Sequence, residues 1–476
     1  MKKLLSLLMV IFTMSLVVSC NNSKNPSEEI VKKEIPAFDS SKEIEIEFWH
    51  AMGKTNQDII QQIIDSFQSL YPNITVTQTS LGDYTTLRDT ITSGIAADEL
   101  PTVAQTYPDH VALYLKGKAL SELNSYIDCE NEIVRADESV DKVGLSKAEQ
   151  DLYVDGFWAE GTIYDAIGTM YSIPFNKSTE VLYYNKTMFD KYGWSVPKTW
   201  NDVVEVSEAF ATTTEYANLV NEGKKCAGFS YDSEANLFIT LTQQWGGEYT
   251  KFNSQGKGEY AFVNAQSKAA IKFYSDNFKK GLLATTTYFG TNYSSDAFKA
   301  GQIVMTLGSS AGASYNVPTD GSFEVGVTTY PQYDLNNAQV IQQGTNVSLF
   351  KCTDPQEELA GWLFMKFLTN YESALLWCTE TSYFPIRKDV LNSDAYKDHI
   401  SGKFVDEEGN VSYKPTTQNL AQKVGLEQQD WFFTNVAFVG SSLARDNAEL
   451  IVKAVLYGEK DIDTAYQEAM DALLYS

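Results

Sequence analysis

Side chains that could ligate a metal ion or attack a substrate are few in this 476-residue chain and lie far apart. The three histidines, His50, His110 and His399, lack the short spacings of zinc sites. The sequence contains no nucleophile elbow, zinc motif or phosphate-binding loop. We therefore expect no metal, no cofactor and no catalytic residue.

Four of the five cysteines, Cys129, Cys226, Cys352 and Cys378, stand outside any CxxC pair. In an exported protein four thiols allow three disulfide pairings. The sequence does not choose between these pairings and buried free thiols.

The fifth cysteine, Cys20, stands where a covalent modification is expected. Two lysines precede an apolar run over residues 4–18, which has the length of a signal peptide and is too short to span a bilayer. The step from Ser19 to Cys20 resembles the bacterial lipobox, which implies cleavage before Cys20 and a diacylglycerol on its sulfur. We expect a signal peptide over 1–19 and a lipidated tether over 20–42, anchored in the cell membrane on its extracellular or periplasmic side. An ordinary signal peptide with an incidental Cys20 is the alternative.

The formal net charge of −25 limits the partners of the chain. Such a chain repels nucleic acid, and no basic stripe offsets the excess. It also repels an anionic ligand unless positive charge or backbone N–H groups are concentrated locally. Arginine is scarce, so each one is a candidate for a specific role: Arg88, Arg135, Arg387 and Arg445.

The elements that must position these residues alternate along the first part of the chain. Residues 44–49 alternate apolar and polar as a half-buried strand does, and apolar residues over 59–67 recur at helical spacing. A strand over 74–77, a helix over 83–97 and a strand over 101–104 follow. This order predicts an α/β fold with a mainly parallel sheet.

The rest of the chain contains further elements and no long linker. We expect strands over 181–184, 303–307 and 323–327. We expect helices near 264–280, 355–370 and 448–457, and one more that begins with Thr199 as its N-cap.

Eight short segments keep the same order as in a known family. They are Phe-Trp-His-Ala-Met at 48–52, Gly-Asp-Tyr at 82–84, Ser-Ile-Pro-Phe-Asn-Lys-Ser-Thr at 172–179, Leu-Tyr-Tyr-Asn-Lys at 182–186, Pro-Lys-Thr-Trp at 197–200, Met-Thr-Leu-Gly-Ser-Ser at 305–310, Gly344 before Val347, and Tyr-Phe-Pro-Ile at 383–386. Together they resemble the family 1 extracellular solute-binding proteins of ABC importers, most of all the members that bind glycerol phosphates and more distantly the maltodextrin binders.

The resemblance implies a two-lobed periplasmic-binding-protein-like fold of type II, whose lobes are joined by crossover strands and close on a ligand in the cleft. The implied crossings lie near residues 173–174, just before Gly344 and around 375–383. The N-terminal lobe is then expected over 43–172 and 343–374, and the C-terminal lobe over 173–342 and 375–476.

Carried over residue by residue, the resemblance implies seven ligand contacts: Tyr84, Asp109, Ser178, Ser309, Gly344, Tyr383 and Arg445. Arg445 matches an arginine beside the ligand's phosphate, and its spacing to Tyr-Gly-Glu-Lys at 457–460 supports the match. A surface salt bridge of Arg445 with Asp446 or Glu449 is the alternative.

The sequence departs from the family pattern at the expected cleft. Pro108 separates Tyr107 from Asp109, where the family has an acidic residue directly after the tyrosine. Either Asp109 binds the ligand hydroxyls from a position one residue later than the family's acidic residue, or the ligand differs. Lys177 in place of a serine and Gln343 in place of a glycine also alter the cleft edge.

The residue types fit a polyol that carries a phosphate. Tyrosine rings can cover C–H faces while carboxylates bind hydroxyls, and Tyr84 and Tyr383 suit this better than Trp200, for which core packing is favoured. Ser309 lies beside Gly308, where backbone can approach a ligand closely. A guanidinium such as that of Arg445 binds phosphate with two parallel hydrogen bonds.

We therefore expect a solute-binding lipoprotein that delivers glycerol-3-phosphate or a glycerophosphodiester, or next an oligosaccharide, to the permease of an ABC importer. One alternative is a secreted, lipid-anchored glycoside hydrolase, which needs two carboxylates about 5–10 Å apart. Another is a surface receptor or adhesin that keeps the binding fold without transport.

Overall fold

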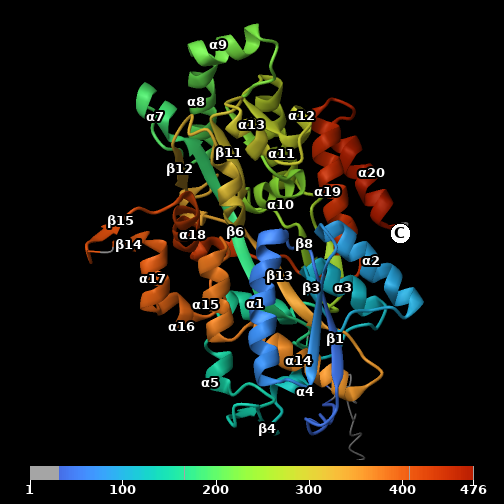
Figure 1. Cartoon of the computed structure of the whole chain (residues 1–476). Coiled ribbons are helices and arrows are strands. Elements are labelled where there is room, and N and C mark those ends of the chain that lie inside the picture. Colours follow the sequence, from blue (N-terminus) through green and yellow to red (C-terminus); the bar gives the residue numbers. More distant parts are fainter. Residues whose placement is uncertain (1–29, 31, 166, 407, 475–476) are drawn as a thin grey trace, which may run out of the picture.

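The computed structural model describes residues 30, 32–165, 167–406 and 408–474, and it has two halves that lie one above the other in Figure 1. One sheet of ten strands runs through both, in the order β10-β7-β11-β6-β13-β3-β1-β2, with β12 also paired to β6 and β16 (Phe432–Phe433) to β13. The half that contains β1 to β3 is called the N-terminal half, and the half that contains β7, β10 and β11 the C-terminal half. The predicted α/β fold class is confirmed.

The N-terminal half is built from parallel strands joined by helices, as the alternating pattern predicts. β1 (Ile44–His50) pairs in parallel with β2 (Ile74–Ser80) and β3 (Val103–Thr106). α1 (Lys54–Leu70) buries the apolar face that its helical spacing predicts, and α2 (Tyr84–Ala97) follows β2. The other elements of this half are α3 (Pro108–Lys116), α4 (Asn124–Ile127), β4 (Glu132–Val134), β5 (Val140–Lys142), α5 (Lys147–Gln150), α6 (Asp155–Ala159) and α14 (Pro355–Leu368).

The C-terminal half repeats this plan. β7 (Phe229–Tyr231) pairs in parallel with β10 (Leu283–Thr285) and β11 (Met305–Ser309). The predicted N-cap Thr199 is confirmed, because its side chain accepts a hydrogen bond from the Asp202 N–H at the start of α8. The helices of this half are α7 (Lys186–Tyr192), α8 (Trp200–Ala211), α9 (Thr214–Asn221), α10 (Glu234–Gln244), α11 (Ala265–Lys279), α12 (Thr286–Phe289), α13 (Ser294–Lys299), α19 (Ser441–Leu456) and α20 (Ile462–Leu474). Its short strands are β8 (Thr250–Phe252), β9 (Gly258–Tyr260) and β12 (Val325–Thr328).

Two antiparallel strands join the halves, β6 (Ile173–Asn185) and β13 (Val340–Leu349). Phe175 of β6 packs in the core of the N-terminal half and Leu182 in the core of the C-terminal half. β13 runs between the same two cores in the opposite direction. The first two crossings that the sequence predicts fall on these strands.

Between the two cores β6 carries five consecutive polar residues, 176–180, and all are buried. Burial of polar groups is costly unless they are hydrogen-bonded. Asn176 Nδ2 donates to the Tyr84 hydroxyl at 3.2 Å, and the Lys177 ammonium pairs with Glu160. These bonds explain why the strand begins well before the apolar stretch in which the sequence predicts it.

The third crossing lies later in the chain than residues 375–383. Trp377 and Tyr396 belong to the core of the N-terminal half, whereas Ala421 packs with Val181 of the C-terminal half. The lobe boundary expected at 375 therefore moves to the segment between α17 and α18, because a helical pattern shows which face is apolar but not which core covers it. The elements concerned are α15 (Tyr371–Glu380), α16 (Lys388–Asn392), α17 (Asp394–Ile400), β14 (Lys403–Val405), β15 (Val411–Tyr413) and α18 (Thr417–Glu427).

Residues 32–42 lie against the N-terminal half, although the sequence predicts a tether as far as residue 42. The Lys33 ammonium pairs with Glu358 at 2.8 Å, and the Lys33 N–H donates to Ser125 Oγ at 2.8 Å. Ile35 is buried in the core. The predicted signal peptide and Cys20 lie outside the described residues. Among the described helices, none is long and apolar enough to cross a membrane.

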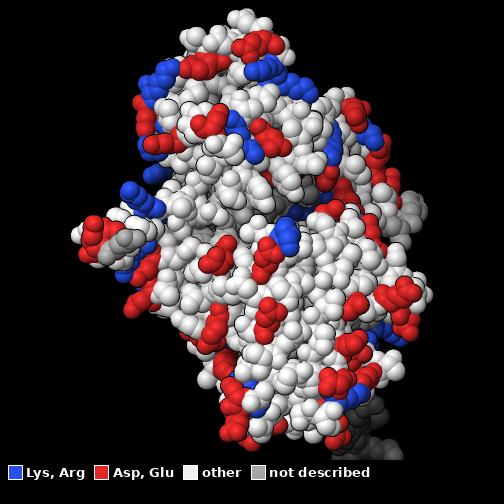
Figure 2. Space-filling model, viewed as in Figure 1, with Lys and Arg blue, Asp and Glu red and all other residues white. Residues whose placement is uncertain are grey.

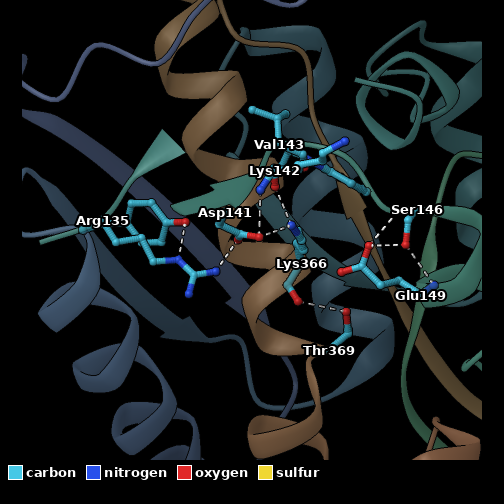
Figure 3. A network of polar contacts seen from close by, with 10 residues as sticks. Arg135, Asp141, Lys142, Val143, Ser146, Glu149, Lys366 and Thr369 are labelled. Atoms are coloured by element: carbon cyan, nitrogen blue, oxygen red, sulfur yellow. Dashed lines mark hydrogen bonds and ion pairs between the residues drawn. The ribbon is translucent and has the colours of Figure 1, made fainter. Parts of the chain in front are cut away.

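A network of ion pairs and hydrogen bonds joins α14 to the β4–β5 hairpin (Figure 3). Lys366 Nζ lies 3.0 Å from Asp141 Oδ1, and Arg135 pairs with the same carboxylate and donates to the Tyr71 hydroxyl at 3.3 Å. Burial alone raises the pKa of Asp141, but Lys366 and Arg135 hold it below its ordinary value. Ion pairs within the N-terminal half thus hold α14 and the β4–β5 hairpin together.

Cys129, Cys226, Cys352 and Cys378 are free thiols in the structure. None of the three disulfide pairings that the sequence allows is formed. Two of the four, Cys226 and Cys378, are buried, as the alternative of buried free thiols expects.

Gly344 is required where β13 passes β6. Its φ of +91° is unfavourable for other residues, and a Cβ there would lie 1.9 Å from the Asn176 carbonyl oxygen. We expect Gly344→Ala to lower the free energy of unfolding by about 2–4 kcal/mol, measured by urea denaturation. Gly312→Ala is the control, because a Cβ at Gly312 meets no atom within 4 Å and its change should stay within about 0.5 kcal/mol. Equal stability of the two variants would contradict the argument.

Candidate functional site

The cleft lies where the carboxyl ends of parallel strands from the two halves face each other. Ligands of open α/β sheets bind at this edge. Segments after β2 and β3 line it from the N-terminal half, and segments after β7 and β11 from the C-terminal half. Figure 2 shows a furrow between the halves, with basic side chains at one point along it. Two adjoining pockets of about 280 and 560 Å³ occupy it and share the residues Tyr84, Tyr107, Gln343 and Gly344.

The smaller pocket, here the arginine pocket, lies between helices of the two halves. Its polar lining includes Arg88, Asp109, His110, Glu160, Asn236, Arg445, Asp446 and Glu449. An N–H of the Arg445 guanidinium on α19 donates to Asn236 Oδ1 on α10. Arg88 on α2 donates to Ser442 Oγ at 3.2 Å, across the cleft. Arg445 is therefore held by a neutral amide, whereas Arg88 also pairs with Asp89 at 2.8 Å and with Asp446 at 3.6 Å.

Arg445 has no carboxylate partner among the described residues. Three of the acids in the pocket are paired with other cations: Glu160 with Lys177, Asp446 with Arg88 at 3.6 Å, and Glu449 with Lys453. The salt bridge with Asp446 or Glu449 that the sequence left open is not formed. The Arg445 guanidinium thus keeps donors for a ligand.

Burial changes the ionisation of two neighbouring groups on α3. It raises the pKa of Asp109, although the nearby Arg445 acts in the opposite direction. It lowers the pKa of His110 to about 3, and Arg88 and Arg445 act in the same direction. His110 is therefore neutral, and its Nδ1 has no hydrogen-bond partner within the part of the chain that is described. A neutral imidazole can accept a hydrogen bond from a ligand or donate one to it.

The larger pocket, here the tyrosine pocket, is lined by rings from both halves. They are Tyr84, Tyr107, Tyr293, Tyr315 and Tyr383. Tyr84 meets Tyr107 edge-on with ring centroids 4.9 Å apart, and Tyr383 stacks on Trp377 at 5.7 Å. Tyr293 and Tyr315 are 62% and 68% exposed. The pocket therefore has a fixed aromatic wall and two exposed rings.

The polar groups of the tyrosine pocket come mainly from the C-terminal half. Ser309 Oγ donates to Ser178 Oγ at 3.2 Å and caps the short 3₁₀ helix that follows by accepting from the Ala311 N–H. Asp232 accepts a hydrogen bond from the Ser294 N–H at 2.7 Å, and burial raises its pKa to about 6. Hydroxyls and carboxylates of this kind bind ligand hydroxyls.

All seven residues that the resemblance implies as ligand contacts line the two pockets. Asp109 and Arg445 line the arginine pocket, Ser178, Ser309 and Tyr383 line the tyrosine pocket, and Tyr84 and Gly344 line both. Their roles toward a ligand remain predictions.

Two other residues that the sequence analysis connected with the cleft lie away from it. Trp200 is buried in the core of the C-terminal half, where its Nε1 donates to Gln244 Oε1 at 2.9 Å. Lys177 does not reach the cleft edge, because its buried ammonium faces Glu160.

Sequence reasoning missed several residues that line the cleft. They are Arg88, Tyr107, His110, Asn236, Tyr293 and Tyr315. The scarcity of arginine and the position of Tyr107 directly after a strand were usable signals for two of them. The others depend on how the halves face each other. The described residues contain no cluster of three or more His, Cys, Asp and Glu that could hold a metal ion.

Comparisons with known proteins agree with this architecture. Residues 62–401 match the family model of the bacterial extracellular solute-binding proteins. The sn-glycerol-3-phosphate-binding periplasmic protein UgpB of Pectobacterium atrosepticum is 27% identical over 357 residues, which cover 72% of this chain and 73% of that protein. The corresponding protein of Yersinia enterocolitica is 27% identical and covers 72% and 74%.

Solved structures share the fold at lower identity. UgpB from Mycobacterium tuberculosis in complex with glycerophosphocholine superposes with a TM-score of 0.70 at 16% identity, covering 90% of this chain and 98% of that one. The GacH receptor of Streptomyces glaucescens gives 0.68 at 16%, covering 90% and 97%. MalE from Bdellovibrio bacteriovorus bound to maltotriose gives 0.67 at 15%, covering 91% and 99%.

The family model spans well over half of the chain, and the cleft between the two halves lies at the ligand-binding edge of both parts of the sheet. The proteins of this family bind solutes and are not enzymes. This chain belongs to the family of bacterial extracellular solute-binding proteins.

Proposed function

We propose that this protein captures a glycerol phosphate, above all a glycerophosphodiester, outside the cell and delivers it to the permease of an ABC importer. Its family and the glycerol-3-phosphate-binding relatives support this reading. A binding protein needs only a shaped cleft with partners for its solute, and no catalytic group is required.

The observation that carries the proposal is the unpaired guanidinium of Arg445 in a chain with a net charge of −25. Acids in the arginine pocket have other cations as partners, and burial favours the neutral form of Asp109. A guanidinium held by an amide keeps several N–H donors in the fork geometry that suits a phosphate. An anion is therefore the complementary ligand of this pocket.

The adjoining tyrosine pocket favours a phosphodiester over a simple phosphate. It adjoins the arginine pocket, and Tyr84, Tyr107, Gln343 and Gly344 line both pockets. Five tyrosines and the Asp232 carboxylate can cover the second substituent of a diester by ring contacts and hydrogen bonds. A ligand with one phosphate between two polar groups would reach both pockets.

An oligosaccharide is the second candidate. Tyrosine rings beside Asp232, Ser178 and Ser309 are also suited to sugar faces and hydroxyls. Solved structures that share the fold contain maltotriose and acarbose. Such a ligand leaves the unpaired charge of Arg445 without a use, and we therefore rank it second.

The lipid anchor belongs to this proposal. Cys20 behind a signal-peptide-like run would carry the acyl chains, and residues 21–31 would connect it to the folded body. Anchoring keeps a binding protein close to its permease. The alternative of a receptor or adhesin without transport shares the same cleft and differs only in its partner.

A thermal-shift screen tests the ligand class. At about 100 times its Kd a ligand stabilises the folded protein by about 2.7 kcal/mol. We expect glycerophosphocholine and sn-glycerol-3-phosphate to raise Tm by several degrees and maltotriose to leave it unchanged. A response to maltotriose alone would establish the second candidate instead, and no response to any of the three would contradict both.

Replacement of Arg445 tests the phosphate contact. Arg445→Ala removes charge-assisted hydrogen bonds that contribute about 1.5–3 kcal/mol, so calorimetric affinity for glycerophosphocholine should fall about 10- to 100-fold with the fold intact. Arg135→Ala is the matched control, because Arg135 lies in the ionic network of Figure 3, and its affinity should stay within about twofold. Unchanged affinity of Arg445→Ala would rule out the phosphate role.

Replacement of Cys20 tests the anchor. In cells, the wild-type protein should partition into the detergent phase of a phase-separation extraction, because acyl chains contribute about 0.8 kcal/mol per buried CH₂. Cys20→Ser should partition into the aqueous phase and be released from washed cells. Cys129→Ser is the control and should remain anchored. Retention of Cys20→Ser in the detergent phase would show that Cys20 carries no anchor.

A further inference from the structure

Glu180 is a buried carboxylate directly behind the arginine pocket. It lies on β6 and is 1% exposed. Its Oε2 accepts from the Tyr231 hydroxyl at 2.5 Å, and its Oε1 accepts from Asn236 Nδ2 at 2.8 Å and from Gln343 Nε2 at 3.2 Å. Three neutral donors therefore surround it, and no ion pair among the described residues includes it.

One amide connects Glu180 to Arg445. Asn236 donates to Glu180 with its Nδ2 and accepts from the Arg445 guanidinium with its Oδ1. If a proton binds to Glu180, it binds to Oε2, and Oε1 remains a hydrogen-bond acceptor. The Asn236 amide therefore keeps the same orientation in both ionisation states of Glu180. The carboxyl group and the guanidinium thus lie on opposite sides of a single side chain.

The charged groups that act on Glu180 are few. Burial raises its pKa to about 7; the hydrogen bonds from Tyr231 and Asn236 and the charge of Arg445 on α19 lower it, and Asp232 raises it further. The other residues packed against it, Gln343 on β13 and Gln428 after α18, are neutral amides. At neutral pH the group is near the midpoint of its titration.

We propose that Glu180 sets the charge at the arginine end of the cleft, so that an anion bound at Arg445 is taken up together with one proton on the Glu180 carboxyl group. This rests on the anionic end of the proposed ligand. With Glu180 ionised, its negative charge lies on the far side of the amide that holds Arg445 and repels the bound anion. Protonation removes that repulsion and leaves the full charge of Arg445 to the ligand.

The tyrosine hydroxyls beside Glu180 can reverse their hydrogen bonds when the carboxylate takes up a proton, so the cluster is kept. The proton comes from solvent and binds to Oε2. The Tyr231 hydroxyl then accepts from Oε2–H and donates to the Tyr330 hydroxyl, which lies 2.9 Å away and can act as either donor or acceptor. Oε1 keeps its bonds from Asn236 and Gln343, so the amide that holds Arg445 does not move.

Inorganic sulfate is the probe that tests this, because its charge is constant between pH 6 and pH 8. We expect the affinity of the wild-type protein for sulfate, measured by thermal shift, to fall up to about tenfold from pH 6 to pH 8 as Glu180 ionises. Glu180→Gln mimics the protonated group. It should bind sulfate at pH 8 about as tightly as the wild type does at pH 6, with less than about twofold change over this range.

Two nearby acids could cause a pH dependence of sulfate binding in place of Glu180, and their variants test this. Asp109→Asn and Asp232→Asn remove two of the other carboxyls whose pKa is raised beside the cleft; the third, Asp446, is paired with Arg88. Both variants should keep the pH dependence. A pH dependence that disappears in either of them and persists in Glu180→Gln overturns the proposal.

Tyr231→Phe provides a second, independent test should Glu180→Gln fail to fold. It keeps the carboxyl group but removes one donor to its ionised form. The midpoint of the pH dependence should therefore move to higher pH. A midpoint that is unchanged or lower overturns the proposal.

The outcome separates this inference from the proposed ligand. Failure of glycerophosphocholine to bind while sulfate shows the expected pH profile would overturn the ligand assignment alone. Sulfate affinity that is equal at pH 6 and pH 8, or absent at both, overturns the role of Glu180 whichever solute the protein binds.

Discussion

The structure depends on one constraint: five consecutive polar side chains of β6 must be hydrogen-bonded inside the protein. Residues 176–180 lie where the strand leaves one core and has not yet entered the next. An unsatisfied buried polar group costs about 1–3 kcal/mol, so each of them requires a partner. The partners come from both halves, and among them are Tyr84, Glu160 and Asn236. The same hydrogen bonds that make the crossing tolerable therefore position the lining of the cleft.

The electrostatics of the cleft follow from the same arrangement. A protein with an excess of 25 negative charges would be a poor receptor for an anion if its cations were spread evenly. Here three of the acids in the pocket of Arg445 are neutralised locally, two by lysines and one by Arg88, and burial favours the neutral form of Asp109. The Arg445 guanidinium, held by the Asn236 amide, then has no carboxylate partner among the described residues. Attraction for the proposed anionic ligand would thus come from the pairing of the surrounding acids and not from added basic residues.

The sequence predicted the regular elements well, because apolar periodicity reports local structure directly. β1, α1, β2 and α2 all form where the pattern indicates. The polar part of β6 could not be predicted, because buried polar residues look like a loop until their partners are known. α19 begins at Ser441, well before its apolar part, for the same reason.

For the site, the family resemblance supplied what periodicity could not. Tyr84 and Arg445 lie far apart in the sequence, and no spacing rule places them in the same pocket. Residues without a motif, such as Glu180 and Asn236, were missed because their importance comes from contacts across the crossing. The sequence also could not predict to which half α15 to α17 belong. An amphipathic pattern shows only that one face of a helix is buried, not which core buries it.

The packing of residues 32–42 has a mechanical consequence. Lys33 pairs with Glu358, and Ile35 is inserted into the core of the N-terminal half. Tension along a chain anchored at Cys20 would enter the molecule at this point and be borne by that half alone. Within the described parts of the chain, the C-terminal half has no such attachment, and its covalent connections are the crossing segments. With the anchor proposed at Cys20, the N-terminal half would stay fixed near the membrane and the C-terminal half would move relative to it.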